Sequence, residues 1–299
     1  LHFGRDALGP LPPWIAVACM GCVLVPMLLL GAAVCILLLE ARGTEVGRMY
    51  GADLVGAAIA AGAILPVLAL VPTPEACALV GLLPVIAAFL CGGRALVAGI
   101  AGVAIVALVL ADDPLRVRRS KMYFEGVELY ERWTPTARLT FFDFGDALAK
   151  ILNADVETAP GHAWGKGTKA PEVLVPQYLM EQDGTASTPI TQFDGDTSDM
   201  SEFDWLLFDV TAAGYQIRKP ERAVIIGGGG GRDILTALRS GATDIDAVEF
   251  NAGVVDTIST RYKEFSGDIY HAKGVTAHVR EGRSFLTQSR GGYDMIQVS

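Results

Sequence analysis

Residues 222–233 read Arg-Ala-Val-Ile-Ile-Gly-Gly-Gly-Gly-Gly-Arg-Asp, the pattern from which the fold of the C-terminal part of the chain can be predicted. The β-branched residues before the glycines are typical of a strand buried on both faces. After the glycines, Ile234, Leu235 and Leu238 recur at helical spacing, which predicts a helix. A glycine turn between a strand and a helix brings backbone N–H groups and a helix N-terminus close to a ligand. A flexible linker is the alternative, but a linker is not expected between two buried elements.

The spacing of the glycines indicates which class of ligand the turn binds. In a dinucleotide pattern G-x-G-x-x-G that starts at Gly227, the third glycine would be Arg232, which disfavours NAD. The Gly-Lys-Ser/Thr of a Walker A loop does not follow either. The alternation of Gly227, Gly229 and Gly231 fits the nucleoside-binding turn of enzymes that use S-adenosylmethionine better. We expect this turn, Gly228 included, to meet the amino-acid end of the cofactor.

Three further strands are predicted downstream, at residues 245–250, 275–279 and 294–298. Glu249 lies near the end of the first of them, where a carboxylate can accept hydrogen bonds from two ribose hydroxyl groups. Glu281 and Gly282 follow the next strand, and we expect Glu281 to face the adenine amino group. Strands that alternate with helices through short connections predict a parallel sheet with right-handed crossovers.

These motifs resemble the spermidine synthase family. The resemblance rests on the glycine stretch, Val-Glu-Phe-Asn at 248–251, Arg-Glu-Gly-Arg-Ser-Phe-Leu at 280–286 and Tyr-Asp-Met-Ile-Gln at 293–297. The chain is most similar to the bacterial membrane-spanning spermidine synthase-like proteins, which have a hydrophobic N-terminal region and a segment like Gly-Arg-Met-Tyr-Gly-Ala-Asp-Leu at 47–54. The resemblance implies S-adenosylmethionine or decarboxylated S-adenosylmethionine as co-substrate, no metal, and aminopropyl transfer to a small-molecule amine.

Two departures from the family pattern affect this expectation. Spermidine synthases usually have Gly-Gly-Gly-Asp-Gly-Gly, and the aspartate helps to hold the aminopropyl end of the donor; here that position is Gly230. Asp233 lies three residues further on and would point elsewhere. The catalytic aspartate of the family follows the fourth strand, where this chain stops at Ser299, so the catalytic residues are unknown. A methyltransferase that uses the same donor, or a non-catalytic membrane scaffold or complex subunit with a degenerate synthase domain, remains the alternative.

The N-terminal third of the chain is predicted to lie in a membrane. Hydrophobic residues make up 51% of the sequence, and the mean hydropathy is +0.38. Residues 1–111 hold only 4 of the 24 Lys and Arg and 5 of the 33 Asp and Glu. Four transmembrane helices are predicted, at residues 14–39, 52–71, 76–91 and 95–111, and the last two are near the lower length limit for spanning. Asp53 is expected to form an ion pair with Arg48 or Arg42 rather than a functional site.

Charge also predicts the topology and the partners. Basic residues are more numerous on the side of the soluble domain, with Arg5, Arg116, Arg118, Arg119 and Lys121 against Arg42, Arg48 and Arg94. The positive-inside rule then predicts a cytoplasmic soluble domain, and the resemblance implies a multi-pass protein of the bacterial inner membrane. The net charge of −9 argues against nucleic acid as a partner and suits a cationic substrate. The expected partners are the lipid bilayer and an amine acceptor, with a homo-oligomer or a membrane complex left open.

The predicted architecture has three parts. Residues 1–111 form a transmembrane helical region, residues 112–200 a small β-hairpin subdomain, and residues 201–299 the N-terminal part of a Rossmann-like, methyltransferase-type α/β domain. The strands of the subdomain are predicted at 127–130, 139–142, 173–180 and 189–193, and a helix at 205–216. Because the chain starts at Leu1 and stops after the fourth strand, we expect a longer protein whose sheet is incomplete at the C-terminus of this sequence.

Overall fold

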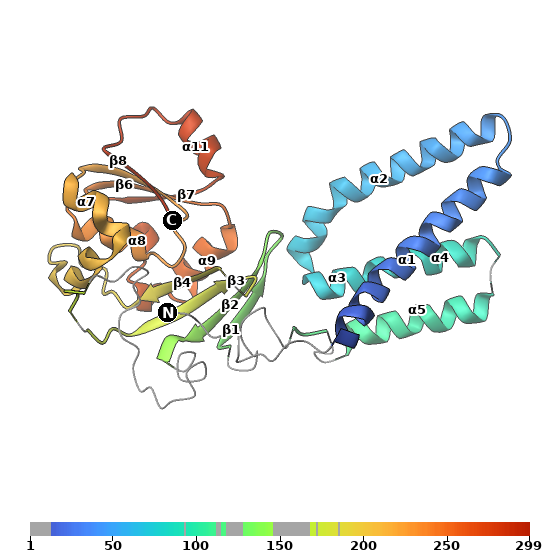
Figure 1. Ribbon diagram of the computed structural model, residues 1–299, viewed down its shortest axis with the longest axis horizontal. Coiled ribbons are helices and arrows are strands. Elements are labelled where there is room, and N and C mark those ends of the chain that lie inside the picture. The colour runs from blue at the N-terminus through green and yellow to red at the C-terminus, as the bar shows by residue number, and fades with distance from the viewer. Residues whose placement is uncertain are drawn as a thin grey trace. The chain divides into compact units, whose positions relative to one another are not determined.

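The computed structural model describes residues 13–92, 94–111, 115–117, 128–145, 168–171, 173–184 and 186–299. By its contacts the chain divides into two compact units, residues 1–71 and residues 72–299. Over its described residues, 13–71, the first unit contains helices only. The second contains further helices, an antiparallel sheet and a parallel sheet, and the elements of both units are labelled in Figure 1.

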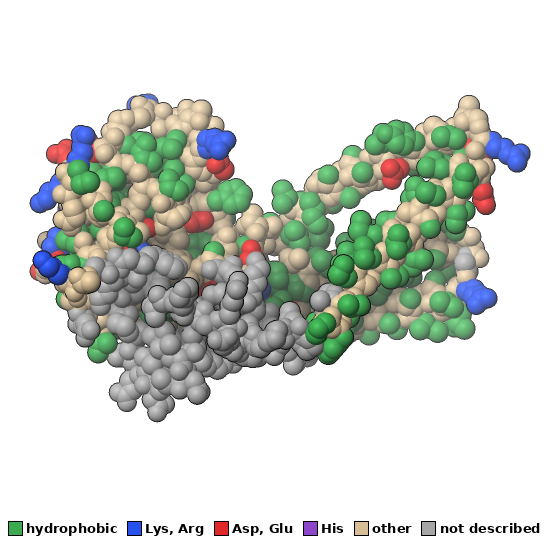
Figure 2. All heavy atoms as spheres, viewed as in Figure 1, with side chains coloured by type: hydrophobic (Ala, Val, Ile, Leu, Met, Phe, Trp, Pro, Cys, Tyr) green, Lys and Arg blue, Asp and Glu red, His purple; other side chains and the backbone are tan. Residues whose placement is uncertain are grey.

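The hydrophobic third of the chain is helical, as predicted. Its helices are α1 (Pro13–Glu40), α2 (Thr44–Leu70), α3 (Thr73–Val80), α4 (Leu82–Leu90) and α5 (Ala95–Leu110). Three segments, Pro13–Glu40, Thr44–Leu70 and Thr73–Leu90, are long and apolar enough to cross a membrane, whereas α5 has 16 residues. Their large apolar side chains are exposed, and Figure 2 shows hydrophobic side chains over the surface of these helices.

Two helix boundaries differ from the prediction. The second helix begins at Thr44 rather than near residue 52, and Glu45 in its first turn accepts a hydrogen bond from the Arg42 N–H at 3.2 Å. A carboxylate at this place stabilises a helix N-terminus. The third predicted helix is divided at Gly81 into α3 and α4. Pro84 has no N–H to continue the helical hydrogen bonds across this point.

The predicted ion pair of Asp53 is not observed. Asp53 is exposed on α2 and forms no ion pair with any residue that the structure describes. Arg48 lies five residues earlier on the same helix, and only residues three or four apart face each other there.

The two predicted β-hairpins form one antiparallel sheet in the order β1-β2-β3-β4. Its strands are β1 (Tyr130–Trp133), β2 (Arg138–Asp143), β3 (Gln177–Gln182) and β4 (Ala186–Thr191). Asp183 and Gly184 lie at the second turn with φ angles of 52° and 71°, as expected for an Asp-Gly hairpin turn. We refer to these four strands as the accessory sheet.

The glycine stretch belongs to a parallel sheet of Rossmann type in the order β7-β6-β5-β8. Its strands are β5 (Arg222–Ile226), β6 (Asp244–Glu249), β7 (Val275–Val279) and β8 (Met295–Val298). The helices after β5, β6 and β7 are α8 (Arg232–Arg239), α9 (Ala252–Thr260) followed by α10 (Lys263–Ser266), and α11 (Gly282–Gln288). Val224 and Ile225 are fully buried, which confirms a strand covered on both faces.

One hydrophobic core joins the two sheets. Leu139 on β2 and Ile190 on β4 belong to the same buried cluster as Ile225 on β5 and Ile234 on α8. The opposite face of the parallel sheet has a smaller cluster formed by Val224, two further buried residues and the side chains packed on them. The accessory sheet therefore lies on the same side of the parallel sheet as α8.

The predicted helix over residues 205–216 is wrong. Two 3₁₀ segments, η1 (Ser201–Phe208) and η2 (Val210–Ala212), precede the short helix α7 (Ala213–Ile217). Asp209 between them has extended backbone angles, and its carboxylate accepts the Thr211 N–H at 2.9 Å. Aspartate competes with a helix in this way because its side chain bonds to nearby backbone groups.

We expect Gly230→Ala to destabilise the soluble part by about 1–3 kcal/mol, the usual cost of overpacking. A Cβ at Gly230 would lie 2.1 Å from the carbonyl oxygen of Pro189 on β4, and a backbone atom cannot move aside alone. Thermal unfolding of the whole chain in detergent measures the effect. Gly214→Ala is the matched control, since its Cβ would meet only the tip of the flexible Met295 side chain, at 3.1 Å. Equal unfolding temperatures for both variants and the wild type would contradict the close approach of β4.

Candidate functional site

The candidate site is the glycine turn at the carboxyl end of β5, where the strand order reverses between β5 and β8. In open α/β sheets, ligands bind outside the carboxyl ends of the strands at such a point. Gly227, Gly229 and Gly231 have φ angles of 89°, 48° and 89°. These angles lie in the left-handed region, which glycine adopts without strain. The backbone conformation of the turn therefore requires glycine at these three alternating positions.

All five N–H groups of the turn already donate hydrogen bonds within the protein. The N–H groups of Gly227, Gly228 and Gly231 donate to backbone carbonyl oxygens. The Gly229 N–H donates to the Glu249 carboxylate at 3.0 Å. The Gly230 N–H donates to the Thr188 hydroxyl of β4 at 3.1 Å. Phosphate-binding loops present unpaired N–H groups to their ligand, so this turn is not organised as a phosphate site.

Protein atoms also occupy the space beside the glycines. A Cβ on Gly228 would lie 2.7 Å from the Tyr270 hydroxyl, and a Cβ on Gly231 would lie 2.7 Å from Ile269. Both neighbours belong to the 3₁₀ segment η3 (Ile269–His271). Burial raises the pKa of Tyr270 well above its usual value, so the phenol stays protonated and donates to the Gly229 carbonyl at 2.8 Å. The absence of side chains in the turn thus makes room for other parts of the chain.

Glu249 ends β6 beside the turn, as the sequence predicts, and is 9% exposed. Its Oε2 accepts the Gly229 N–H at 3.0 Å, and its Oε1 accepts the Asn251 N–H at 2.9 Å. A carboxylate oxygen has two lone pairs, so each of the two can accept one further hydrogen bond. This arrangement is suited to a pair of neighbouring hydroxyl groups.

Glu281 and Gly282 lie at the start of α11. The Glu281 carboxylate accepts the N–H groups of Ser284 and Arg283 at 2.7 and 2.9 Å, which caps the helix and lowers the pKa of Glu281. A Cβ on Gly282 would lie 2.4 Å from Ile226, the residue before the turn. The structure therefore brings Gly282 to the end of β5. Within the described residues, the hydrogen bonds of the Glu281 side chain all remain in its own helix.

The accessory sheet supplies two residues that the sequence did not predict. Thr188 on β4 accepts the Gly230 N–H, as described above. Thr134, in the turn between β1 and β2, accepts a hydrogen bond from the Asn251 side-chain amide at 3.2 Å. Asn251 in turn caps α9 by accepting the Gly253 N–H at 3.0 Å. No local pattern marks either threonine, because they reach the site only through the packing of the two sheets.

A buried charge cluster lies behind the turn. Arg232, 3% exposed, forms an ion pair with Asp209, also 3% exposed. Asp233, 4% exposed, lies 3.6 Å from the same guanidinium and accepts a hydrogen bond from the Ser299 hydroxyl. Burial and the Asp233 carboxylate raise the pKa of the nearby Tyr215. In the sequence, Arg232 and Asp233 form a charged pair at the start of an apolar helix. No sequence pattern identifies Asp209 as the partner of Arg232.

No metal centre is found in the described part of the chain, where no three His, Cys, Asp or Glu side chains form a group that could hold an ion. The sequence has five cysteines, and four of them are free and exposed: Cys22, Cys35, Cys77 and Cys91. They lie on or directly beside the apolar helices.

Spermidine synthases are among the solved structures that are similar to this chain. One is spermidine synthase in complex with the transition-state analogue AdoDATO, at 13% identity and a TM-score of 0.34, and it covers 62% of this chain and 57% of its own. Another is spermidine synthase from Thermotoga maritima, at 13% identity and a TM-score of 0.35, and it covers 62% of this chain and 56% of its own. The chain thus spans a little over half the length of each. No family model and no curated protein matches it.

Proposed function

We propose that this chain is a membrane-anchored transferase of the spermidine synthase type. It binds S-adenosylmethionine or decarboxylated S-adenosylmethionine at the carboxyl edge of the parallel sheet and transfers an aminopropyl group to an amine. The proposal rests on Glu249, whose carboxylate is held by Gly229 and Asn251 at the strand-order reversal with lone pairs left for two hydroxyl groups. A nucleoside ribose offers such a pair of hydroxyl groups.

The hydrogen bonding of the glycine turn supports a nucleoside donor over a dinucleotide or a nucleoside triphosphate. All of its N–H groups are paired inside the protein. A phosphate would have to replace these bonds, whereas a ribose approaches the Glu249 carboxylate without doing so.

The transfer needs little chemistry from the protein. The amine nitrogen forms a bond to the methylene carbon beside the sulfonium sulfur, the carbon–sulfur bond breaks, and its electron pair stays on the neutral thioether that leaves. The amine proton passes to a base. Orientation of two bound substrates supplies most of the rate enhancement in such a reaction, and a positioned base supplies the rest. The residues of this chain assigned here bind and orient the donor.

The packing around Gly230 favours the two alternative functions for the same fold, a methyltransferase or a non-catalytic scaffold. The family aspartate at this position would hold the aminopropyl end of the donor, but the Pro189 carbonyl occupies the space of any side chain there. Asp233 is buried and bonded to Ser299 and Arg232. A methyltransferase does not need an aspartate for an aminopropyl group, and a non-catalytic scaffold needs no donor. Donor binding therefore separates the enzyme from the scaffold.

For the cellular site, we propose the bacterial inner membrane with the soluble part in the cytoplasm. The apolar helices support a membrane location by their length and composition, and the basic residues after α5 favour the cytoplasmic side for the soluble part. S-adenosyl donors are made in the cytoplasm, so the glycine turn must face that compartment for the proposed reaction.

We expect the purified chain to bind S-adenosylmethionine, its decarboxylated form or methylthioadenosine in isothermal titration calorimetry. Glu249→Gln should weaken binding by about 1.5–3 kcal/mol, the range for hydrogen bonds to a charged group. Glu221→Gln is the matched control, since this exposed carboxylate lies at the opposite end of β5. Failure of the wild type to bind any of the three at millimolar concentration would remove the enzyme proposal and leave the scaffold.

The topology gives a second test. A cysteine placed at Thr44, at the start of α2, should react with an impermeant thiol reagent in intact cells of a cysteine-free variant, whereas one at Ser289 should not. The residues after α5 drive this orientation, because each basic residue near an anionic leaflet contributes about 1 kcal/mol. Labelling at Ser289 in intact cells would place the soluble part outside and contradict the proposed location. Labelling at neither position would mean that α5 or the Thr73–Leu90 segment does not cross.

A further inference from the structure

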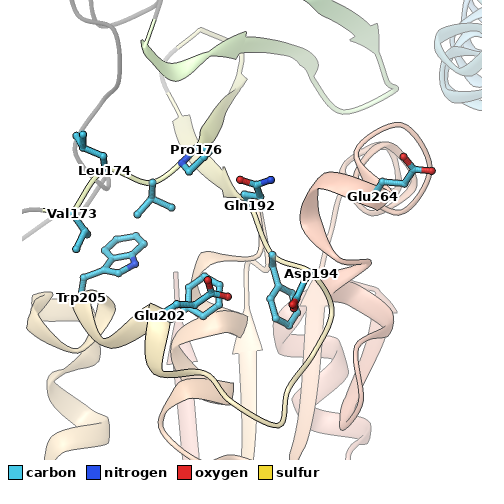
Figure 3. A pocket seen from close by; sticks show the side chains of 11 residues that line it. Val173, Leu174, Pro176, Gln192, Asp194, Glu202, Trp205 and Glu264 are labelled. Atoms are coloured by element: carbon cyan, nitrogen blue, oxygen red, sulfur yellow. The ribbon is translucent and has the colours of Figure 1, made fainter.

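A pocket of about 490 Å³ lies apart from the candidate nucleoside site. Its walls come from the segment before β3, the segment after β4, the 3₁₀ segment η1 and the helix α10 (Figure 3). None of its lining residues belongs to the glycine turn or to the end of β6. The volume falls within the range of pockets that bind small molecules.

The interior wall of the pocket is apolar and rigid. Phe193 and Phe203 are 2% and 1% exposed and pack edge to face at 5.6 Å between ring centroids. Val173 and Val175 line the side that leads into β3, and Figure 3 shows Val173 near Trp205. Such a wall is suited to the carbon chain or ring of an organic ligand.

Trp205 presents an unused hydrogen-bond donor. The residue is 4% exposed, and its indole Nε1 is buried without a hydrogen-bond partner among the described residues. In Figure 3 the nitrogen lies on the side of the ring that faces Glu202 and the pocket. Buried tryptophan N–H groups usually find a partner, because an unpaired buried donor is costly. The pocket therefore offers a place for an acceptor oxygen.

Three carboxylates line the same pocket, those of Asp194, Glu202 and Glu264. None of them forms an ion pair with a Lys, Arg or His in the described ranges of the chain. The neighbouring Asp204, by contrast, is paired with Arg239. Unpaired carboxylates at one pocket raise the local concentration of cations. The rim is thus acidic while the interior is apolar with one free N–H donor.

We propose that this pocket binds an alkylammonium ion that also carries an uncharged oxygen acceptor, such as an amide carbonyl. The ammonium group lies against Glu202 and Asp194, the carbon chain lies along the phenylalanine wall, and the oxygen accepts the Trp205 N–H. The site uses none of the residues proposed to bind the nucleoside, so it stands whether or not the chain is a transferase.

Three ligands with the same six-carbon chain separate these contributions in isothermal titration calorimetry on the whole chain in detergent. The compound 6-aminohexanamide has the ammonium group and the carbonyl, hexylamine has only the ammonium group, and hexanamide has only the carbonyl. We expect 6-aminohexanamide to bind about tenfold more tightly than either of the others, as for the loss of one hydrogen bond or ionic contact. Added salt should weaken the two amines and leave hexanamide unchanged.

Variants assign the binding to the pocket. Trp205→Phe removes the N–H donor and keeps a ring, and Glu202→Gln removes one charge; each should weaken 6-aminohexanamide about tenfold. Glu221→Gln, an exposed carboxylate outside the pocket, should bind as the wild type does. Circular dichroism and thermal unfolding establish that each variant is folded, and Trp205→Leu, which also has no donor, replaces Trp205→Phe if the latter is not.

Three results would overturn the proposal. The first is no binding of 6-aminohexanamide by the wild type at millimolar concentration. The second is equal affinity of the wild type and both pocket variants, which would place the ligand elsewhere. The third is binding of hexylamine as tight as that of 6-aminohexanamide, which would mean that the Trp205 N–H is not used. Because these compounds are not nucleosides, none of the results bears on the glycine turn.

Discussion

The close approach of β4 to the glycine turn is the contact on which the candidate site depends. The Pro189 carbonyl lies where a Cβ at Gly230 would be, and the neighbouring Thr188 hydroxyl accepts the Gly230 N–H. The hydrophobic core continues across this junction, from Ile190 on β4 to Ile225 on β5. The accessory sheet thus forms one wall of the turn, and the parallel sheet forms the other. Neither sheet makes the site alone, because the glycines fit their neighbours on both sides.

The buried charges behind the turn link the same two regions. Arg232 on α8 bonds Asp209, the residue at which the expected helix is interrupted. Removing charges from water is costly, and an ion pair recovers that cost only with good geometry and further hydrogen bonds. The guanidinium also donates to the Thr211 hydroxyl at 3.2 Å, and Asp233 is close to it. These bonds hold the start of α8 against η2, so the helix that follows the turn has a defined position.

The two regions with ligand chemistry differ in kind. At the carboxyl edge of the parallel sheet, the N–H groups are paired and a carboxylate keeps free lone pairs, so hydroxyl groups are better partners than phosphates. At the pocket beside Trp205, an acidic rim surrounds an apolar wall. The chain as a whole has a net charge of −9, which favours the approach of cations to both. The apolar side chains of the N-terminal helices are exposed and are suited to a lipid environment.

Elements with local sequence patterns could be predicted without the structure. The apolar helices, and the strand, glycine turn and helix of residues 222–239, follow from hydrophobic periodicity and turn chemistry. Glu249 could be placed beside the turn because parallel strands end at one edge of the sheet. What surrounds the turn depends on tertiary packing. Thr188 and Tyr270 reach the turn from segments that are distant in sequence, and Thr134 reaches Asn251 beside it. Asp209 interrupts the expected helix, and its ion-pair partner Arg232 lies 23 residues further along the chain. Such contacts arise from the packing of one element on another. The periodicity of hydrophobic residues and the turn residues within a single segment do not indicate which distant segment will pack against it.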